Sequence, residues 1–158
     1  MTVWGALMGG FVGTLVLTTI LRAASELHRT RIDLPFLLGT MVTADRKRAK
    51  AIGYLMHFFF GFAFALGYLA IFVAIGRAGW LLGAGLGLLH GIFSGTALVN
   101  ALLPAVHQRM GDTTTAADRV ALLESPGFMM TNYGAATPVV MLVAHVAYGA
   151  IVGGFIAM

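Results

Sequence analysis

The stretch GYLMHFFFGFAFALGYLAIF, residues 53–72, decides the fold of this chain. It contains no Asp, Glu, Lys or Arg. A helix of about 20 such residues crosses a hydrocarbon layer of about 30 Å, so the stretch predicts a membrane span. One histidine, His57, lies inside it. A histidine in hydrocarbon is costly unless it is hydrogen-bonded, ligated or facing protein, so His57 marks a candidate functional site.

The whole chain has the composition of an integral membrane protein. Of its 158 residues, 59% are hydrophobic and only 10% are charged, and the mean hydropathy is +0.89. This leaves too few polar side chains to cover a water-soluble globule of that size. Cysteine is absent, which excludes disulfides, iron–sulfur clusters and covalently attached c-type haem. Any metal or haem would therefore need His, Met or oxygen ligands.

Four apolar segments are long enough to span a membrane as helices. They cover about residues 3–21, 51–75, 80–103 and 138–158. Two shorter segments, about 33–42 and 114–124, have the pattern of interfacial helices. The sequence thus predicts one all-α domain, an integral membrane four-helix bundle with short interfacial helices on the cytoplasmic side.

The basic residues predict the orientation of the bundle. Nine of the ten Lys and Arg residues follow the first or the third span, and Arg77 alone follows the second. The positive-inside rule assigns the side with these nine basic residues to the cytoplasm, which places both termini on the extracytoplasmic side. Because the cations flank membrane spans, the net charge of +4 does not indicate a nucleic-acid partner. The expected partner of the apolar surface is the lipid bilayer.

Two later spans also carry a histidine, His90 in GLLHGIFSG and His145 in LVAHVAYG. Helix geometry places His57 about 9 Å and His145 about 11 Å from the cytoplasmic ends of their helices, but His90 about 20 Å. We therefore predict that His57 pairs with His145 and that His90 lies deeper by more than one turn. Gly61 and Gly149 follow the paired histidines at His-x-x-x-Gly spacing, which would leave room for a flat cofactor.

The three histidines allow three interpretations. Each could be structural, bonded to a nearby hydroxyl or carbonyl group of a neighbouring helix. Alternatively, His57 and His145 could be the axial ligands of haem b, with His90 near the cofactor edge. A metal site or a proton relay is the third interpretation.

Weaker signals lie elsewhere in the chain. His107 and Met110 have His-x-x-Met spacing near the cytoplasmic surface and are a weak candidate site for a soft metal. A small ion or metal transporter is a further alternative, with Asn100 and Asn132 as polar liners, although no Asp or Glu lies in a predicted span. We find no Ser-His-Asp order, zinc-protease motif or Gly-rich phosphate loop, so we expect at most a redox carrier subunit and no enzyme.

Glycines repeat at intervals of four in the first, third and fourth spans. The repeats are Gly5, Gly9 and Gly13, then Gly83, Gly87 and Gly91, then Gly149 and Gly153. Such stripes let helices approach closely. Because they exceed what one small bundle must bury, we expect the chain to be an accessory or assembly subunit of a larger membrane complex or a homo-oligomer. A bis-histidine haem protein in electron transfer is the alternative.

Five motifs in a fixed order resemble a known family. They are DLPFLLGTM, HFFFGFAFALGY, LLHGIFSG, GFMMTNYG followed by TP, and the closing HVAYG. The chain resembles an uncharacterised family of small bacterial four-helix membrane proteins, a domain of unknown function. The resemblance implies a four-span α-helical protein of the bacterial cytoplasmic membrane and implies no activity, so no functional residue is carried over from it.

Overall fold

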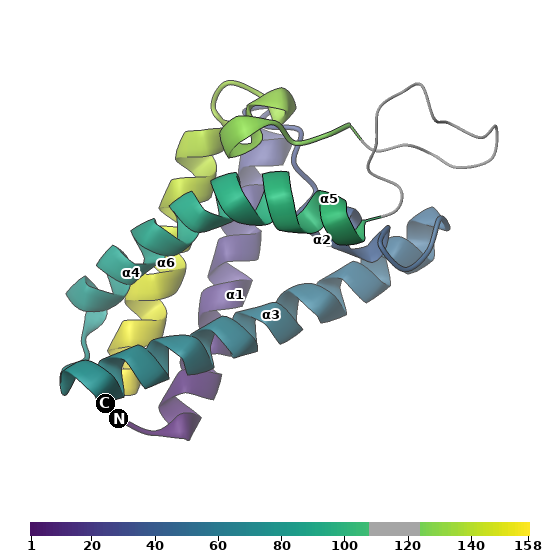
Figure 1. Cartoon of the computed structure of the whole chain (residues 1–158). Helices are drawn as coiled ribbons and strands as arrows, with labels where there is room; N and C mark the ends of the chain where they lie inside the picture. Colours follow the sequence, from purple (N-terminus) through teal and green to yellow (C-terminus); the bar gives the residue numbers. More distant parts are fainter. Residues whose placement is uncertain (108–123) are drawn as a thin grey trace.

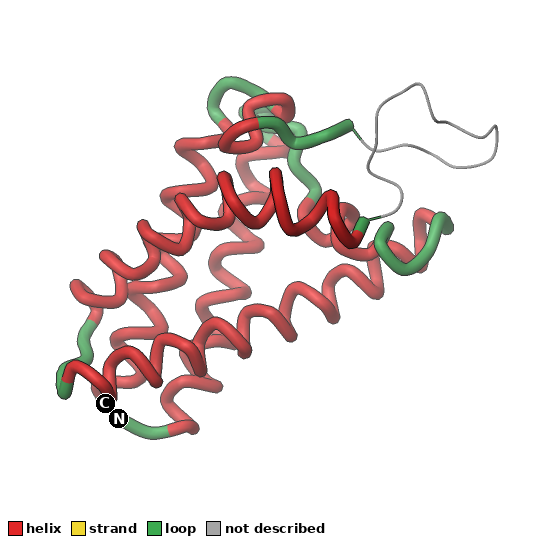
Figure 2. The backbone as a smooth tube through the Cα atoms, in the orientation of Figure 1, coloured by secondary structure: helices red, strands yellow, loops and turns green. Residues whose placement is uncertain are grey.

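The computed structural model describes residues 1–107 and 124–158. These ranges are helical and contain no β-strand, as Figure 2 shows, which confirms the predicted all-α fold. The helices are α1 (Val3–Glu26), α2 (Leu34–Gly39), α3 (Arg46–Ile75), α4 (Trp80–Phe93), the π-helix η1 (Ser94–Leu102), α5 (Leu103–Val106), the 3-10 helix η3 (Phe128–Tyr133) and α6 (Thr137–Ala157).

Four helical segments are long and apolar enough to cross a membrane, as predicted. They are α1, α3, the continuous segment Trp80–Val106 and α6. Helix α1 begins after Thr2, whose hydroxyl accepts a hydrogen bond from the Gly5 amide. Helix α3 begins after Asp45, whose carboxylate accepts from the Arg48 amide. Because of this cap, α3 begins at Arg46, before the start of the predicted apolar span at about residue 51.

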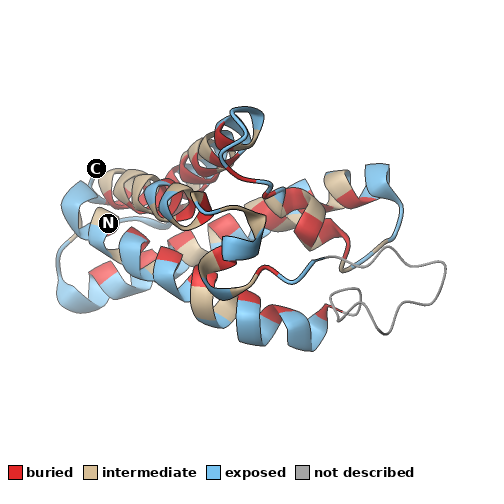
Figure 3. Ribbon diagram, turned by 90° about the horizontal axis from the view of Figure 1, so that it is seen from above, coloured by how far each residue is buried: buried red, intermediate tan, exposed pale blue. Residues whose placement is uncertain are grey.

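Helix α6 lies at the centre of the packing, with α1 and α4 against it. Helix α3 packs against α1 and α2 and touches α6 at only a few residues. Figure 1 shows α3 crossing beside α1, with the α4–η1–α5 segment above α3 in this view. Buried residues lie on the inward surfaces of the helices and exposed ones on the outer surfaces, as Figure 3 shows. The outward apolar side chains are therefore available to lipid.

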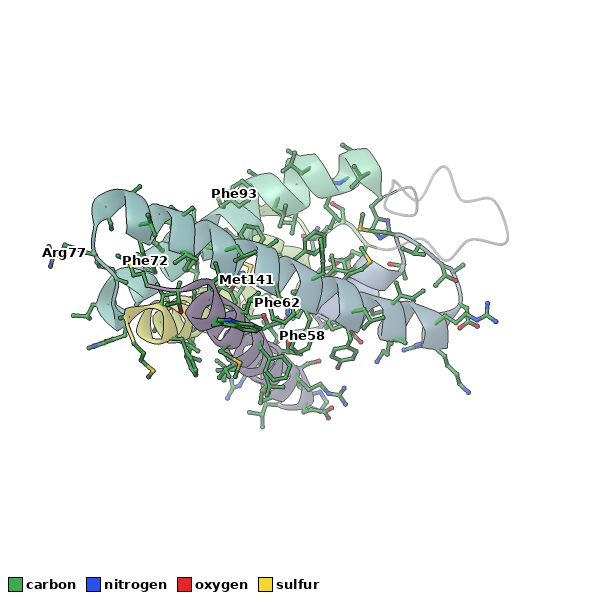
Figure 4. The ribbon with its side chains drawn as sticks, turned by 90° about the horizontal axis from the view of Figure 1, so that it is seen from below. Phe58, Phe62, Phe72, Arg77, Phe93 and Met141 are labelled. Carbon is green, nitrogen blue, oxygen red and sulfur yellow. The ribbon has the colours of Figure 1, made fainter. Side chains whose placement is uncertain are left out.

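The two termini lie at the same end of the bundle (Figure 1). The tight turn between α3 and α4 begins at Gly76, whose φ of 69° suits glycine. Arg77 projects from that turn, as Figure 4 shows. The other cations of the described residues lie in the last turns of α1, in the loop after it or in the first turns of α3.

Helices α1 and α3 pack through aromatic side chains over glycine. Phe58 and Phe62 of α3 lie beside α1 (Figure 4). The ring centroids of Phe58 and Phe11 are 5.5 Å apart, and Phe62 covers Gly10. A neighbouring ring fills the space that each small residue leaves, which holds α3 against α1.

The predicted interfacial segment at about 33–42 contains α2, which packs on protein. Asp33 caps α2 by accepting from the Phe36 amide at 3.1 Å. A Cβ on Gly53 of α3 would overlap the backbone of Pro35, so α2 lies directly on α3. The other predicted interfacial segment, at about 114–124, lies outside the described residues except for its last residue, Glu124.

The segment before α6 folds back onto the end of α1. The Arg31 amide donates to the Tyr133 carbonyl at 2.7 Å, and the hydroxyl groups of Thr30 and Thr137 are 2.7 Å apart. In η3, Met129 and Met130 have φ values of 52° and 60°, which are uncommon outside glycine. The Met130 side chain is buried in the bundle as a result.

Candidate functional site

The glycine stripes of α4 and α6 set the position of the histidines. The two helices run antiparallel, so glycines spaced four residues apart on α4 lie opposite residues spaced four apart on α6, in reverse order. A Cβ on Gly83 would meet the backbone of Gly149, and one on Gly87 would meet the carbonyl group of His145. Gly91 lies against the His145 side chain. This register places His145 beside the part of α4 that carries His90.

His90 and His145 are in direct ring contact. Their centroids are 4.8 Å apart with an interplanar angle of 81°. The prediction that His90 lies deeper by more than one turn was therefore wrong. It counted residues from sequence-predicted helix ends, whereas the glycine contacts between α4 and α6 set the relative level of the two histidines, and the third span changes to a π-helix at Ser94. Distances counted from a sequence-predicted helix end do not hold for such a segment.

Each of these two rings has a further partner. Nδ1 of His145 lies 2.8 Å from the Met141 carbonyl oxygen, which can only accept, so Nδ1 carries the proton and Nε2 is an acceptor in the neutral ring. Nδ1 of His90 lies 3.4 Å from the Tyr68 hydroxyl. The His90 ring also stacks on Phe64 with a centroid distance of 3.9 Å. Both rings therefore have a hydrogen-bond partner within the chain.

His57 differs from both. It lies on the buried stripe of α3 with Gly53 and Gly61, and 8% of its surface is exposed. Its Nε2 is buried and has no hydrogen-bond partner among the described residues. A buried polar atom without a partner costs about 1–3 kcal/mol, so a hydrogen-bond partner for this nitrogen would stabilise the protein.

The two glycines that were expected to leave room for a flat cofactor are covered by protein. A Cβ on Gly61 would overlap the Thr14 side chain of α1, and one on Gly149 would overlap the backbone of Gly83 and Gly87. The Gly61 carbonyl also accepts a hydrogen bond from the Tyr148 hydroxyl, which links α3 to α6. The room for a macrocycle beside these glycines is therefore filled by α1 and α4.

All three histidines nevertheless border one cavity of about 370 Å³. It lies between α3 and the α4–η1–α5 segment, with α1 and α6 behind it. We call it the histidine cavity. Its lining comprises Thr14, Leu17, Leu21, Ile32, Leu34, Leu38, Met41, His57, Phe60, Gly61, Phe64, His90, Ser94, Leu98, Val99, Leu102, Leu103, Ala105, Val106, Met130, Met141, His145 and Tyr148.

The lining is chiefly apolar, and its polar residues are the three histidines with Thr14, Ser94 and Tyr148. It also includes Leu102 and Val106, which are 53% and 61% exposed. A cavity with an apolar body, a few fixed polar groups and an edge toward lipid suits an apolar ligand with one polar group.

The π-helix η1 is the part of the site that sequence reasoning missed. It contributes Ser94, Leu98 and Val99 to the cavity wall. Asn100 stabilises it, since its side-chain amide donates to the carbonyl groups of Gly95 and Thr96 at 3.0 Å each. Asn100 is the residue in the sequence that could have indicated the π-helix, because its side chain bonds to the carbonyl five residues back.

His107, the histidine of the weak candidate metal site, is hydrogen-bonded within the chain. His107 is buried, and its Nε2 lies 3.1 Å from both the Leu37 carbonyl oxygen and the Thr40 hydroxyl. Because the carbonyl can only accept, Nε2 donates and joins the end of α5 to α2. Met110 lies outside the described residues. Within residues 1–107 and 124–158, no three His, Asp or Glu side chains converge closely enough to hold a metal ion.

Comparison with known proteins gives a family without an assigned function. No curated protein and no solved structure matched the chain. One family model, described as "Family of unknown function (DUF6789)", matches residues 1–158. This match confirms the resemblance to an uncharacterised family that the five sequence motifs indicated. The chain therefore belongs to this family of unknown function, DUF6789.

Proposed function

We propose that this protein binds a lipophilic molecule inside the membrane, with the ligand's apolar chain in the histidine cavity and its polar group on His57. The observation that carries the proposal is His57, which belongs to the lining of a cavity of about 370 Å³ and whose buried Nε2 has no partner among the described residues. A ligand that hydrogen-bonds this atom would remove a desolvation cost that the empty protein bears.

The chemistry of the cavity selects the class of ligand. A neutral imidazole presents one donor and one acceptor nitrogen, so His57 can meet a hydroxyl or a carbonyl group. The rest of the wall offers mainly Leu, Val, Met and Phe side chains. An alkyl or prenyl chain with a single neutral oxygen function would satisfy both parts.

The ligand has a direct route from the bilayer. Helix α3 packs on α1 and α2, and α4 packs on α6. The cavity lies between α3 and the α4–η1–α5 segment. Phe60 of α3 and Leu102 and Val106 of the third span form its exposed edge. A hydrocarbon chain would enter sideways through that edge and remain out of water throughout.

The same proposal includes the location and orientation of the chain. Both termini lie at one end of the bundle, and the cations after α1 and at the start of α3 lie at the other. The positive-inside rule favours extracytoplasmic termini, and the bacterial cytoplasmic membrane is the expected location. The three histidines of the cavity would then lie within the membrane.

The haem alternative has less support. The space expected beside Gly61 and Gly149 is filled, and His145 contacts His90 directly. The unpartnered His57 is compatible with one axial ligand only. A reduced-minus-oxidised spectrum of the purified protein decides the question. A stoichiometric Soret band that disappears in His145→Ala would favour haem over a lipophilic ligand.

Association with other subunits and transport stay predictions. The glycine stripes that motivated association are used inside the chain, where those of α1 and α4 face α6 and that of α6 faces α4. The described cavity lining contains no Asp or Glu, which gives a cation carrier little to bind. We therefore place ligand binding first. Light scattering of the purified protein would reveal an oligomer.

The test uses labelled hexadecanol, a single alkyl chain with one hydroxyl. Ala105→Trp places an indole at the exposed edge of the cavity, and the matched control Ala101→Trp places one on the same segment at an exposed residue outside the lining. In equilibrium binding in detergent, we expect saturable binding to wild type and to Ala101→Trp, and a loss of about tenfold in Ala105→Trp. Equal binding by all three proteins would overturn the proposal.

A further inference from the structure

A second, polar pocket of about 180 Å³ lies beside the histidine cavity. It is formed by the last turns of α1, the start of α2 and the first half of α3. Four residues line both spaces: Leu21, Ile32, Leu34 and His57. The two spaces therefore adjoin each other, and His57 lies at their boundary.

The polar pocket contains balanced charges. Arg22 and Glu26 form one ion pair at 2.8 Å, and Lys50 and Asp33 form another at 2.9 Å. Two cations and two carboxylates give a formal charge of zero. All four side chains are between 41% and 65% exposed. Exposed ion pairs contribute little to stability, so a ligand can exchange them for its own charges at small cost.

We infer that the ligand is a zwitterionic phospholipid whose head group lies in the polar pocket and whose acyl chain lies in the histidine cavity. This inference rests on the proposed function and adds the chemistry of the head group. The phosphate would lie between Arg22 and Lys50, and the ammonium group beside Glu26 and Asp33. His57, at the boundary, would meet the ester oxygen that joins head group and chain.

Charge complementarity favours a zwitterion over an anion. A phosphate without an ammonium group would occupy the two cations and leave Glu26 and Asp33 unpaired beside a negative charge. An uncharged head group would leave both protein ion pairs as they are and gain no charge-assisted hydrogen bond. Only a head group with both charges replaces each exchanged ion pair with a new one.

The position of the pocket agrees with this ligand. The last two turns of α1, the loop after it and the first turns of α3 carry the basic residues that mark the membrane surface, which is the level of phospholipid head groups. The histidine cavity extends from the same place into the bundle. An amphiphile placed along this line has its charges at the surface and its chain among apolar side chains.

The experiment compares three single-chain lipids in competition with labelled hexadecanol. They are lysophosphatidylethanolamine, which is zwitterionic, lysophosphatidylglycerol, which is anionic, and monoacylglycerol, which is uncharged. We expect wild type to bind the zwitterion about tenfold more tightly than either of the others. Equal affinities for the zwitterion and the anion would overturn the inference.

Variants separate this inference from the proposed function. The double variant Arg22→Gln with Lys50→Gln should bind the zwitterionic lipid no more tightly than the uncharged one. The double variant Glu26→Gln with Asp33→Asn should bind the zwitterionic lipid no more tightly than the anionic one. Asn keeps the α2 cap that Asp33 provides. The control Arg29→Gln with Lys47→Gln changes the same charges outside the pocket. If head-group variants change nothing while Ala105→Trp still blocks hexadecanol, only the head-group inference fails.

Discussion

The imidazole rings of His90 and His145 lie 4.8 Å apart at an angle of 81°, in a contact that the glycine register of α4 and α6 imposes. Gly87 and Gly91 let the His145 backbone and side chain approach α4. Both histidines also have other partners, Tyr68 and Met141. This leaves His57 as the one membrane histidine of the described residues with an unpartnered buried nitrogen.

The first prediction concerns this nitrogen. His57→Leu removes a buried polar atom without a partner, so we expect the ligand-free protein to become more stable by about 1 kcal/mol. The same change should weaken hexadecanol binding about tenfold, since the hydroxyl loses its partner. Thermal unfolding of delipidated protein and equilibrium binding measure the two effects. A lower Tm together with unchanged binding would show that His57 has only a structural role.

The second prediction tests the helix register. Gly87→Ala places a methyl group against the backbone of His145, which cannot move without separating α4 from α6. We expect a loss of stability of about 2–3 kcal/mol. Gly85→Ala is the matched control, because nothing lies within 4 Å of a Cβ there. Because alanine favours a helix over glycine, Gly85→Ala should raise the free energy of unfolding by about 0.5–1 kcal/mol. Similar melting temperatures for the two variants would contradict this packing.

The third prediction concerns the link between α5 and α2. His107 Nε2 donates to the Leu37 carbonyl and lies 3.1 Å from the Thr40 hydroxyl. A double-mutant cycle of His107→Ala and Thr40→Val should give a coupling of about 1 kcal/mol in thermal unfolding. Additive losses would show that the two side chains do not interact.

The fourth prediction concerns pH. Burial raises the pKa of Tyr133 to about 12, the Glu124 carboxylate adds to the rise and Arg31 opposes it. The pKa of a tyrosine phenol in the unfolded chain is about 10. The raised pKa in the folded state therefore adds stability that is fully present below pH 10 and is lost as the pH rises toward 12. Because Tyr133 is partly exposed, the loss should be on the order of 1 kcal/mol.

Tyr133→Phe isolates this contribution. The variant keeps the ring and lacks the hydroxyl that donates to the Glu124 carbonyl at 2.8 Å. The difference in Tm between wild type and Tyr133→Phe should narrow between pH 10 and 12. A constant difference across that interval would mean that the Tyr133 hydroxyl does not titrate there.

Much of the fold could be predicted because hydropathy and length determine which segments can span a membrane. The four spans and the α2 segment follow from runs of apolar residues and from Asp33 and Pro35. The placement of His57 and Gly61 on one face of α3 follows from their helical spacing, and the structure buries that face. These features depend only on local sequence and on the bilayer thickness.

The site was less predictable because it depends on contacts between helices. The sequence identifies the three histidines, but the contact of His90 with His145 depends on which glycine stripes meet. Nothing local shows that Thr14 fills the space beside Gly61. The cavity itself arises because α3 packs on α1 and barely touches α6. Such tertiary choices have no periodic signal in one sequence.

Photolabelling with a diazirine-bearing hexadecanol tests the central claim most directly. After irradiation of the protein in detergent, peptide mass spectrometry would locate the attached chain. We predict saturable labelling at Val99 and Met141 inside the histidine cavity, removed by excess unlabelled hexadecanol and by Ala105→Trp. Labelling spread over outward residues such as Leu55 and Leu89, without competition, would contradict the claim that this protein holds a lipophilic molecule in its interior.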